Sequence, residues 1–236
     1  PTRELVIQIA GVFNTLGKHT NVTTLGLLGG VEQEPQIAKL KKGVDVLVAT
    51  PGRLFDLISQ GYVKLESLQV LVLDEADHML DLGFIKDIRQ LMRHLPRYRQ
   101  TLFFSATINP EIKDLAYSLV TKPVRIQISP KDPVSKNVDH YVSFIPMDDK
   151  RFFLERFIKE NIDNKILVFV RTKVRAERVK SAMARVDLVT ETIHGDKEQK
   201  ERNETMIKFT SGEVKVLIAT DISARGIDIS NIDFVV

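Results

Sequence analysis

The sequence contains no cysteine, and this absence excludes a disulfide framework and every metal site built from thiolates. Long apolar runs are also missing, since no uncharged stretch approaches the ~20 residues that a helix needs to cross a bilayer. We expect no secretory leader, since the sequence starts in the polar segment "PTREL". Together these absences are typical of a protein of the reducing cytoplasm without a membrane partner, and we expect that location.

A strong excess of charge of one sign is missing as well. The 236 residues carry a net charge of only +3, spread evenly over both halves of the chain, and the isoelectric point is about 9.0. This excludes a basic tail, and it permits a nucleic-acid partner without arguing for one. A hydrophobic content of 43% and a charged content of 28% are ordinary for a globular protein of one or two domains.

Short apolar runs recur along the chain, and they are continuous rather than alternating. Such runs are typical of strands buried on both faces of a parallel sheet. Amphipathic helical patterns lie between them, over residues 84–95 and 174–183. The alternation predicts an α/β fold built from parallel β-α-β units. The expected strands are Val46–Ala49, Val70–Leu73, Leu102–Phe104, Ile166–Val170, Val216–Ala219 and Phe234–Val236.

A polar segment rich in proline and small residues, "SPKDPVSKNVD", interrupts this alternation. We interpret it as a linker over residues 129–139, between a first domain over 1–128 and a second over 140–236. The segments "DVLVATPGR" and "KVLIATDISAR" echo each other, and each follows an apolar stretch that ends in glycine. The repeated order favours duplication of one unit, although chance likeness between two parallel strands is the alternative.

Three carboxylates, Asp74, Glu75 and Asp77, follow the apolar run "VLVL" directly. One interpretation is structural, with Asp77 as a helix N-cap and the other two solvated. The other is a hydrated Mg²⁺ site, because Mg²⁺ keeps most of its waters and is held by one or two carboxylates together with nucleotide phosphates. A strand that ends in an apolar residue followed by Asp-Glu has the Walker-B form of nucleoside triphosphatases.

Two further segments favour the Mg²⁺ interpretation. "SAT" (residues 105–107) follows the next expected strand and offers two hydroxyl groups that are expected to hydrogen-bond to Asp77. "TPGR" (residues 50–53) places a hydroxyl, a turn and a guanidinium at the start of a helix, where free N–H groups suit a phosphate. An ordinary strand-to-helix turn is the alternative for the second segment.

In combination, these residues resemble the DEAD-box ATP-dependent RNA helicases, with a bacterial character, over nearly the whole chain. Any one motif is weak, but eight in the order and spacing of the family are specific. They are "PTREL" (1–5), "GG" (29–30), "TPGR" (50–53), "DEAD" (74–77), "SAT" (105–107), "ILVFVRT" (166–172), "HGDKEQKER" (194–202) and "ATDISARGIDI" (219–229).

The resemblance implies two RecA-like parallel-sheet domains in tandem, ATP and Mg²⁺ as cofactors, and single-stranded or duplex RNA as the partner. Asp74 would hold Mg²⁺ through water, and Glu75 would orient or deprotonate the attacking water. Asp77, Ser105 and Thr107 would couple the nucleotide state to domain closure. Gly226 and Asp228 would lie at the nucleotide, with Asp228 near the ribose.

The resemblance also implies contacts with the RNA backbone, which would be largely independent of base sequence. From the first domain these would come from Thr2, Arg3, Gly30, Thr50, Gly52 and Arg53. From the second domain they would come from Arg171, Gly195, Gln199, Arg202 and Thr220. We assign no chemistry to His194, which we interpret as structural. Phe152, Phe153 and Phe157 have helical spacing, and we expect them in the core rather than stacked on bases.

No G-x-x-x-x-G-K-[ST] phosphate loop occurs in the sequence, and the arginine-rich motif of the family is absent too. We therefore expect a piece of a longer protein, with both domains incomplete and little ATPase activity of its own. Two alternatives stay open. One is an RNA clamp that binds the backbone without hydrolysing ATP, and the other is a related translocase on DNA, which "DEAD", "SAT" and "TPGR" disfavour.

Overall fold

The structure is a computed structural model, and it describes residues 1–120, 122–128, 138–220, 229 and 231–236. The chain divides into two compact units, Pro1–Val124 and Arg125–Val236. Residues 129–137, most of the predicted linker, lie outside the described residues. No described helix is both long enough and apolar enough to span a membrane.

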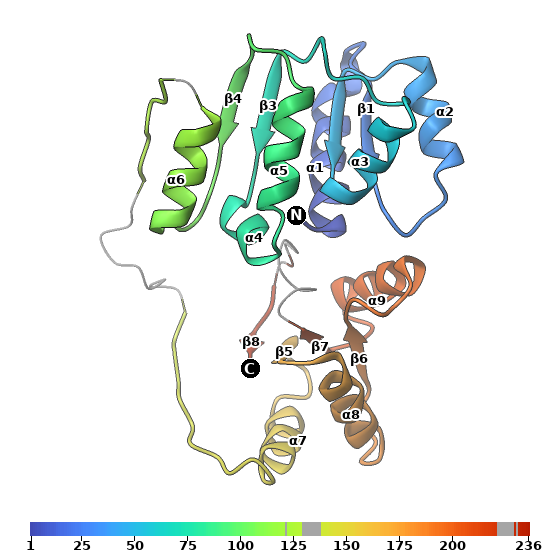
Figure 1. Cartoon of the computed structure of the whole chain (residues 1–236). Helices are drawn as coiled ribbons and strands as arrows, with labels where there is room; N and C mark the ends of the chain where they lie inside the picture. Colours follow the sequence, from blue (N-terminus) through green and yellow to red (C-terminus); the bar gives the residue numbers. More distant parts are fainter. Residues whose placement is uncertain (121, 129–137, 221–228, 230) are drawn as a thin grey trace. The chain divides into compact units, whose positions relative to one another are not determined.

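Unit 1 (Pro1–Val124) contains two parallel strand pairs rather than one continuous sheet. β1 (Thr24–Leu27) pairs with β2 (Val46–Ala49), and β3 (Val70–Leu73) pairs with β4 (Gln100–Phe103). All four strands run in the same direction, as Figure 1 shows. The helices are α1 (Arg3–Leu16), α2 (Glu34–Lys42), α3 (Pro51–Ser59), α4 (Ala76–Asp81), α5 (Ile85–Leu91) and α6 (Pro110–Leu119).

Unit 2 (Arg125–Val236) contains one parallel sheet in the order β6-β7-β5-β8. Its strands are β5 (Ile166–Val170), β6 (Thr190–Ile193), β7 (Val216–Thr220) and β8 (Phe234–Val235). Its helices are α7 (Lys150–Glu160), α8 (Lys173–Ala184) and α9 (Gln199–Ser211) (Figure 1). The predicted α/β fold with parallel strands is confirmed in both units.

Each unit has its own core. In unit 1 one cluster joins β3 to α4, α5 and α6, and another lies around Leu25, Leu27 and Leu57. In unit 2 one cluster packs α7 and α8 against one face of the sheet, and Phe209 of α9 packs in a cluster on the other face. Burial of apolar area at about 25 cal/mol per Å² is the main stabilising contribution in each unit.

Several sequence predictions need correction. The strands β1 and β6 were missed, because "TLGL" and "TETI" carry threonines instead of a continuous apolar run. The helix expected over 84–95 is shorter and ends in a 3₁₀ turn at Met92–His94. β3 is buried on one face only, since Val70 and Val72 are 47% and 51% exposed while Leu71 and Leu73 are buried.

The prediction that three phenylalanines lie in the core is wrong for two of them. Phe152 and Phe153 are 55% and 52% exposed and lie in the first turn of α7, whereas the buried residue of this helix, Ile158, lies near its other end. Phe157 is partly buried in the core of unit 2 and meets the ring of Phe234 edge-on, with the ring centroids 5.2 Å apart. Helical spacing identified the helix, but it did not show how wide its buried face is.

Candidate functional site

The acidic motif lies at the carboxyl end of β3. Asp74 is exposed and follows the last residue of the strand, and one of its oxygens accepts a hydrogen bond from the Glu75 N–H at 2.9 Å. Glu75 has left-handed backbone angles (φ 51°, ψ 51°), and α4 begins directly after it. The Ala76 N–H donates to the carbonyl of Phe104 at 3.1 Å, which fixes this sharp turn against the end of β4.

Asp77 joins the acidic turn to the segment after β4. Its Oδ2 accepts hydrogen bonds from the backbone N–H and the hydroxyl of Thr107, at 2.9 and 2.8 Å. The expectation that both hydroxyls of "SAT" bind Asp77 is therefore confirmed for Thr107 and wrong for Ser105, whose hydroxyl donates to the Thr107 carbonyl at 2.7 Å. Asp77 is also not the N-cap of α4, because the helix begins at Ala76.

The hydrogen bonds at Asp77 control its charge. Partial burial raises the pKa of this carboxyl. The hydrogen bonds from Thr107 and from the His78 N–H lower the pKa by a larger amount, so that it lies below its ordinary value. Asp77 is thus a carboxylate at neutral pH, and an ionised acceptor forms a stronger hydrogen bond with Thr107 than a neutral one.

His78 is a residue that the sequence analysis did not identify. Its Nδ1 lies 3.1 Å from Oε2 of Glu75, and its side chain is 15% exposed. The spacing of three residues from Glu75 was the available signal, because side chains three apart share a helix face. The contact holds the Glu75 carboxylate in one direction at the edge of unit 1.

A second group of residues at this edge surrounds the loop after β1. These residues are among those predicted to contact the RNA backbone. Thr2 caps α1 through the Leu5 N–H at 3.3 Å, and the guanidinium of Arg3 lies against Gly30, where a Cβ would approach it to 2.7 Å. Gly30 has φ +75°, so a side chain would be strained there in any case. Arg53 donates to the Val31 carbonyl at 2.9 Å. The loop therefore lies between the two arginines.

The start of α3 completes this second group. Thr50 precedes Pro51 in extended conformation, and its side chain does not cap the helix. A Cβ on Gly52 would have no heavy atom within 4 Å, so the backbone there is open to a ligand. Nη1 of Arg53 is buried without a hydrogen-bond partner among the described residues. Free N–H groups and a guanidinium at a helix start form a suitable anion site.

Unit 2 places further predicted residues at the carboxyl edge of its sheet. Arg171 follows β5 and is exposed, Gly195 follows β6 with open space beside it, and Thr220 ends β7 and is buried. Gln199 and Arg202 lie in the first turn of α9 and are only 4% and 7% exposed. Gly226 and Asp228 lie outside the described residues.

His194 is buried and belongs to a polar network around Glu177, whose side chain is exposed. Its Nε2 lies 2.9 Å from Oε1 of Glu177, and the same carboxylate oxygen accepts the Thr192 hydroxyl at 2.6 Å. Partial burial raises the pKa of Glu177. The hydrogen bonds from Thr192 and His194 and the charge of Lys197 together lower the pKa by a larger amount, so that it lies below its ordinary value. The network ties α8 to the end of β6, in keeping with a structural role for His194.

The two units repeat one arrangement. β1 and β2 pair in parallel with Leu27 opposite Ala49, and β6 and β7 pair in the same way with Ile193 opposite Ala219. In both pairs a threonine directly follows the alanine, and a glycine lies two positions after its partner. The sequence echo thus corresponds to equivalent positions in two sheets, which supports duplication.

The donor set at the acidic turn fits a hydrated Mg²⁺ ion and not a cage of protein ligands. Within the described part of the chain, no group of three or more His, Cys, Asp or Glu side chains is placed to hold a metal ion. Asp74 is exposed, and its second carboxylate oxygen has no donor among the described residues. One carboxylate together with waters and phosphate oxygens is an ordinary Mg²⁺ environment.

Comparison with known proteins identifies both halves of the chain. Residues 1–115 match the family DEAD/DEAH box helicase, and residues 149–236 match the helicase conserved C-terminal domain. The whole chain is 42% identical to ATP-dependent RNA helicase RhlB of Shewanella frigidimarina and covers 55% of it. It is 40% identical to ATP-dependent RNA helicase DBP3 of Lodderomyces elongisporus and covers 46% of it.

Solved structures agree with these matches. Dbp5 of S. cerevisiae bound to RNA and ADP BeF3 matches the whole chain with a TM-score of 0.89 at 29% identity, and the chain covers 60% of it. A hypothetical ATP-dependent RNA helicase from Sulfolobus tokodaii matches 97% of the chain at 32% identity and a TM-score of 0.52, with 66% of that protein covered. The chain spans about half the length of the curated relatives that it matches. With both conserved regions present in order, the chain belongs to the DEAD/DEAH box helicase family.

Proposed function

We propose that this chain is the core of an RNA-stimulated ATPase that couples ATP hydrolysis to local unwinding of duplex RNA. The observation that carries the proposal is the hydrogen-bonded link between "DEAD" and "SAT", in which Thr107 donates twice to Asp77 while Asp74 stays exposed. Relatives named ATP-dependent RNA helicases and a neighbour bound to RNA and ADP BeF3 support the substrate classes.

In this proposal Asp74 would hold Mg²⁺ through water, and Glu75 would orient or deprotonate the water that attacks the terminal phosphate. The contact with His78 supports this orientation, because it fixes the direction of the Glu75 carboxylate. A bound Mg²⁺ ion would neutralise charge on the phosphate oxygens. The nucleotide state would be coupled to domain closure by Asp77, Ser105 and Thr107. The nucleotide itself would be contacted by Gly226 and Asp228.

RNA backbone binding is proposed for the arginine and helix-start group of unit 1 and for the sheet edge of unit 2. The openness of Gly52 and Gly195 supports close approach of a sugar-phosphate chain at both edges. Gln199 and Arg202 are buried, so their predicted RNA contacts require a local rearrangement of the start of α9. The domain bounds 1–128 and 140–236 and the cytoplasmic location stay predictions.

The absence of a phosphate loop favours a second candidate for the 236 residues by themselves, namely an RNA clamp that does not hydrolyse ATP. ATP hydrolysis with and without single-stranded RNA, by this chain beside a form extended at both ends, separates the two functions. We expect RNA-stimulated turnover in the extended form alone, and we expect Glu75→Gln to abolish it.

Three results would contradict the proposal. If the extended form binds RNA without hydrolysing ATP, the clamp is the better interpretation. Stimulation by single-stranded DNA in place of RNA would favour a DNA translocase. Turnover by the 236 residues that disappears with Glu75→Gln would show that they need no added phosphate loop.

A further inference from the structure

A groove of about 700 Å³ runs along α8 in unit 2, and the residues that the proposed function uses do not line it. Its lining includes a stripe with helical spacing, from Val174 through Arg178 of α8 to Arg185, which directly follows the helix. At about 1.5 Å per residue, this stripe is about 17 Å long. Two small residues, Ser181 and Ala182, lie between the arginines and leave the groove hollow.

The groove is rich in positive charge. Five cationic side chains line it, against two carboxylates. Both carboxylates are already engaged, since Glu177 binds Thr192 and His194, and Asp196 pairs with Lys173. The cations are Arg151, Lys173, Arg175, Arg178 and Arg185.

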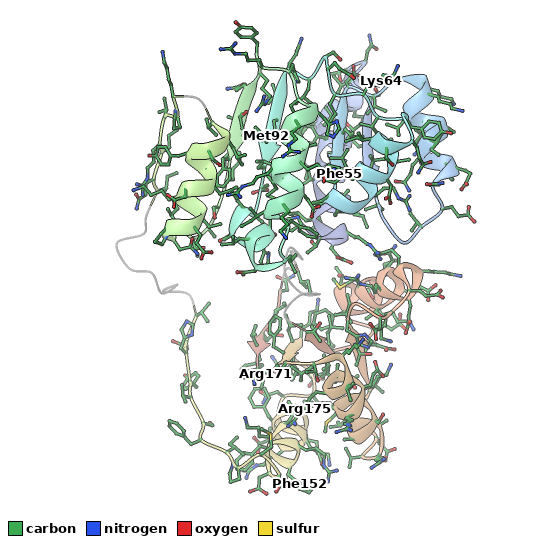
Figure 2. The ribbon with its side chains drawn as sticks, viewed as in Figure 1. Phe55, Lys64, Met92, Phe152, Arg171 and Arg175 are labelled. Atoms are coloured by element: carbon green, nitrogen blue, oxygen red, sulfur yellow. The ribbon has the colours of Figure 1, made fainter. Side chains whose placement is uncertain are left out.

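Most of these cations lack a carboxylate partner among the residues that the structure describes. Arg178 and Arg185 are exposed, and their guanidinium groups have no ion pair or hydrogen bond there. Nη2 of Arg175 meets only the sulfur of Met147 at 3.0 Å, a weak acceptor, and Arg151 lies over the ring of Phe152 at 4.5 Å from its centroid. Figure 2 labels Arg175 and Phe152 in unit 2. These guanidinium groups are available to an anionic ligand.

The helix itself adds a reason to expect an anion. The first turn of α8 contains no acidic residue and instead carries Lys173 and Arg175. Cations at a helix N-terminus are unfavourable, because the N-terminal end of the helix dipole is positive. A phosphate group bound at this end would offset that repulsion.

The position of the groove indicates which anion it takes. His194 and Asp196 line it, and they flank Gly195 at the sheet edge. Lys173, which also lines the groove, lies two residues after Arg171, another proposed backbone contact. A strand bound at Arg171 and Gly195 would therefore continue directly into the groove.

We propose that this groove binds the phosphodiester backbone of single-stranded RNA that extends past the sheet edge of unit 2. This proposal rests on the RNA binding in the proposed function. It adds a second site, which is formed by residues that the proposed function does not use. Guanidinium groups bind phosphate through paired hydrogen bonds, and four of the five cations are arginines.

Binding of oligouridylates of about 6 and about 15 nucleotides, within the usual range of single-strand site sizes, tests the proposal on this chain. Fluorescence anisotropy over a series of salt concentrations gives the affinity and its salt slope. For R178Q/R185Q we expect several-fold weaker binding of the long RNA and unchanged binding of the short one. The salt slope for the long RNA should fall by about 1.4, at about 0.7 for each lost contact.

R156Q/K159Q is the matched control. It removes the same charge from α7, outside the groove, where both cations pair with glutamates. We expect it to change neither affinity. Equal losses of affinity in both double variants would overturn the proposal that the groove binds RNA, since the loss of positive charge alone would explain them. Wild-type binding that does not depend on RNA length would overturn it as well.

Two other outcomes separate the groove from the function on which it rests. If wild type binds neither RNA, RNA binding by this chain fails and the groove fails with it. If a peptide of about twelve glutamates binds and R178Q/R185Q abolishes that binding without affecting long RNA, the groove belongs to an acidic protein segment and the RNA assignment is overturned.

Discussion

At the scale of single residues, the turn after β3 concentrates strain and charge. Glu75 has a left-handed backbone, which costs a residue with a side chain roughly 1–2 kcal/mol. The hydrogen bond from Ala76 to Phe104 and the contact with His78 hold this conformation. Strained residues of this kind cluster at functional sites, in keeping with the role that we propose for Glu75.

Gly30→Ala should lower the stability of unit 1 by about 1–2 kcal/mol, because a positive φ disfavours a Cβ and the new atom would lie 2.7 Å from the Arg3 guanidinium. Urea denaturation measures the loss. Gly52→Ala is the control, since its Cβ would meet no heavy atom within 4 Å. Equal losses in both variants would contradict the close approach of Arg3 to Gly30.

Thr107→Val removes the hydroxyl that donates to Asp77 at 2.8 Å and should cost about 1 kcal/mol at pH 7. The folded pKa of Asp77 lies below its ordinary value, so this carboxylate stabilises the fold above pH ~4 and loses its effect as the pH falls through the folded pKa.

The difference between wild type and Thr107→Val should therefore shrink below pH ~4. Denaturation midpoints at neutral and acidic pH test this, with Thr107→Ser as the control that keeps the hydroxyl. A difference that does not change with pH would show that Asp77 is not the group involved.

At the scale of elements, α7 and α9 differ in how they use their phenylalanines. Phe209 of α9 is fully buried, whereas Phe153 of α7 is 52% exposed. We expect Phe209→Ala to destabilise unit 2 by about 3–5 kcal/mol, since it leaves a cavity. Phe153→Ala should change stability by less than about 0.5 kcal/mol, as is usual for surface positions. Thermal melts of both variants check this contrast, and a large loss for Phe153→Ala would show that α7 packs more deeply.

At the scale of the whole molecule, each unit carries its own clusters of buried residues. The clusters of unit 1 involve residues up to Val120, and those of unit 2 begin at Leu154. Units with separate cores can unfold separately. We expect two denaturation transitions, of which Thr107→Val shifts one and Phe209→Ala the other. A single transition shifted by both variants would show that the units unfold together.

The sequence by itself determined the family, the α/β class and most of the strands, because these depend on local signals. Motif residues such as Asp74 and Glu75 follow apolar runs directly, and a short apolar run such as "VLVL" predicts a strand from its own residues. The threonine-bearing strands β1 and β6 lack that signal and were missed.

Only the tertiary structure decided which side chains meet. Glu177 binds the Thr192 hydroxyl from 15 positions away, and Arg53 donates to the Val31 carbonyl from 22 positions away, and no local pattern encodes such pairs. Folding also turned Ser105 toward a backbone carbonyl and left Phe152 at the surface. The physical reason is that partner choice and burial depend on how separate elements pack, whereas strand and helix formation depend mainly on neighbouring residues.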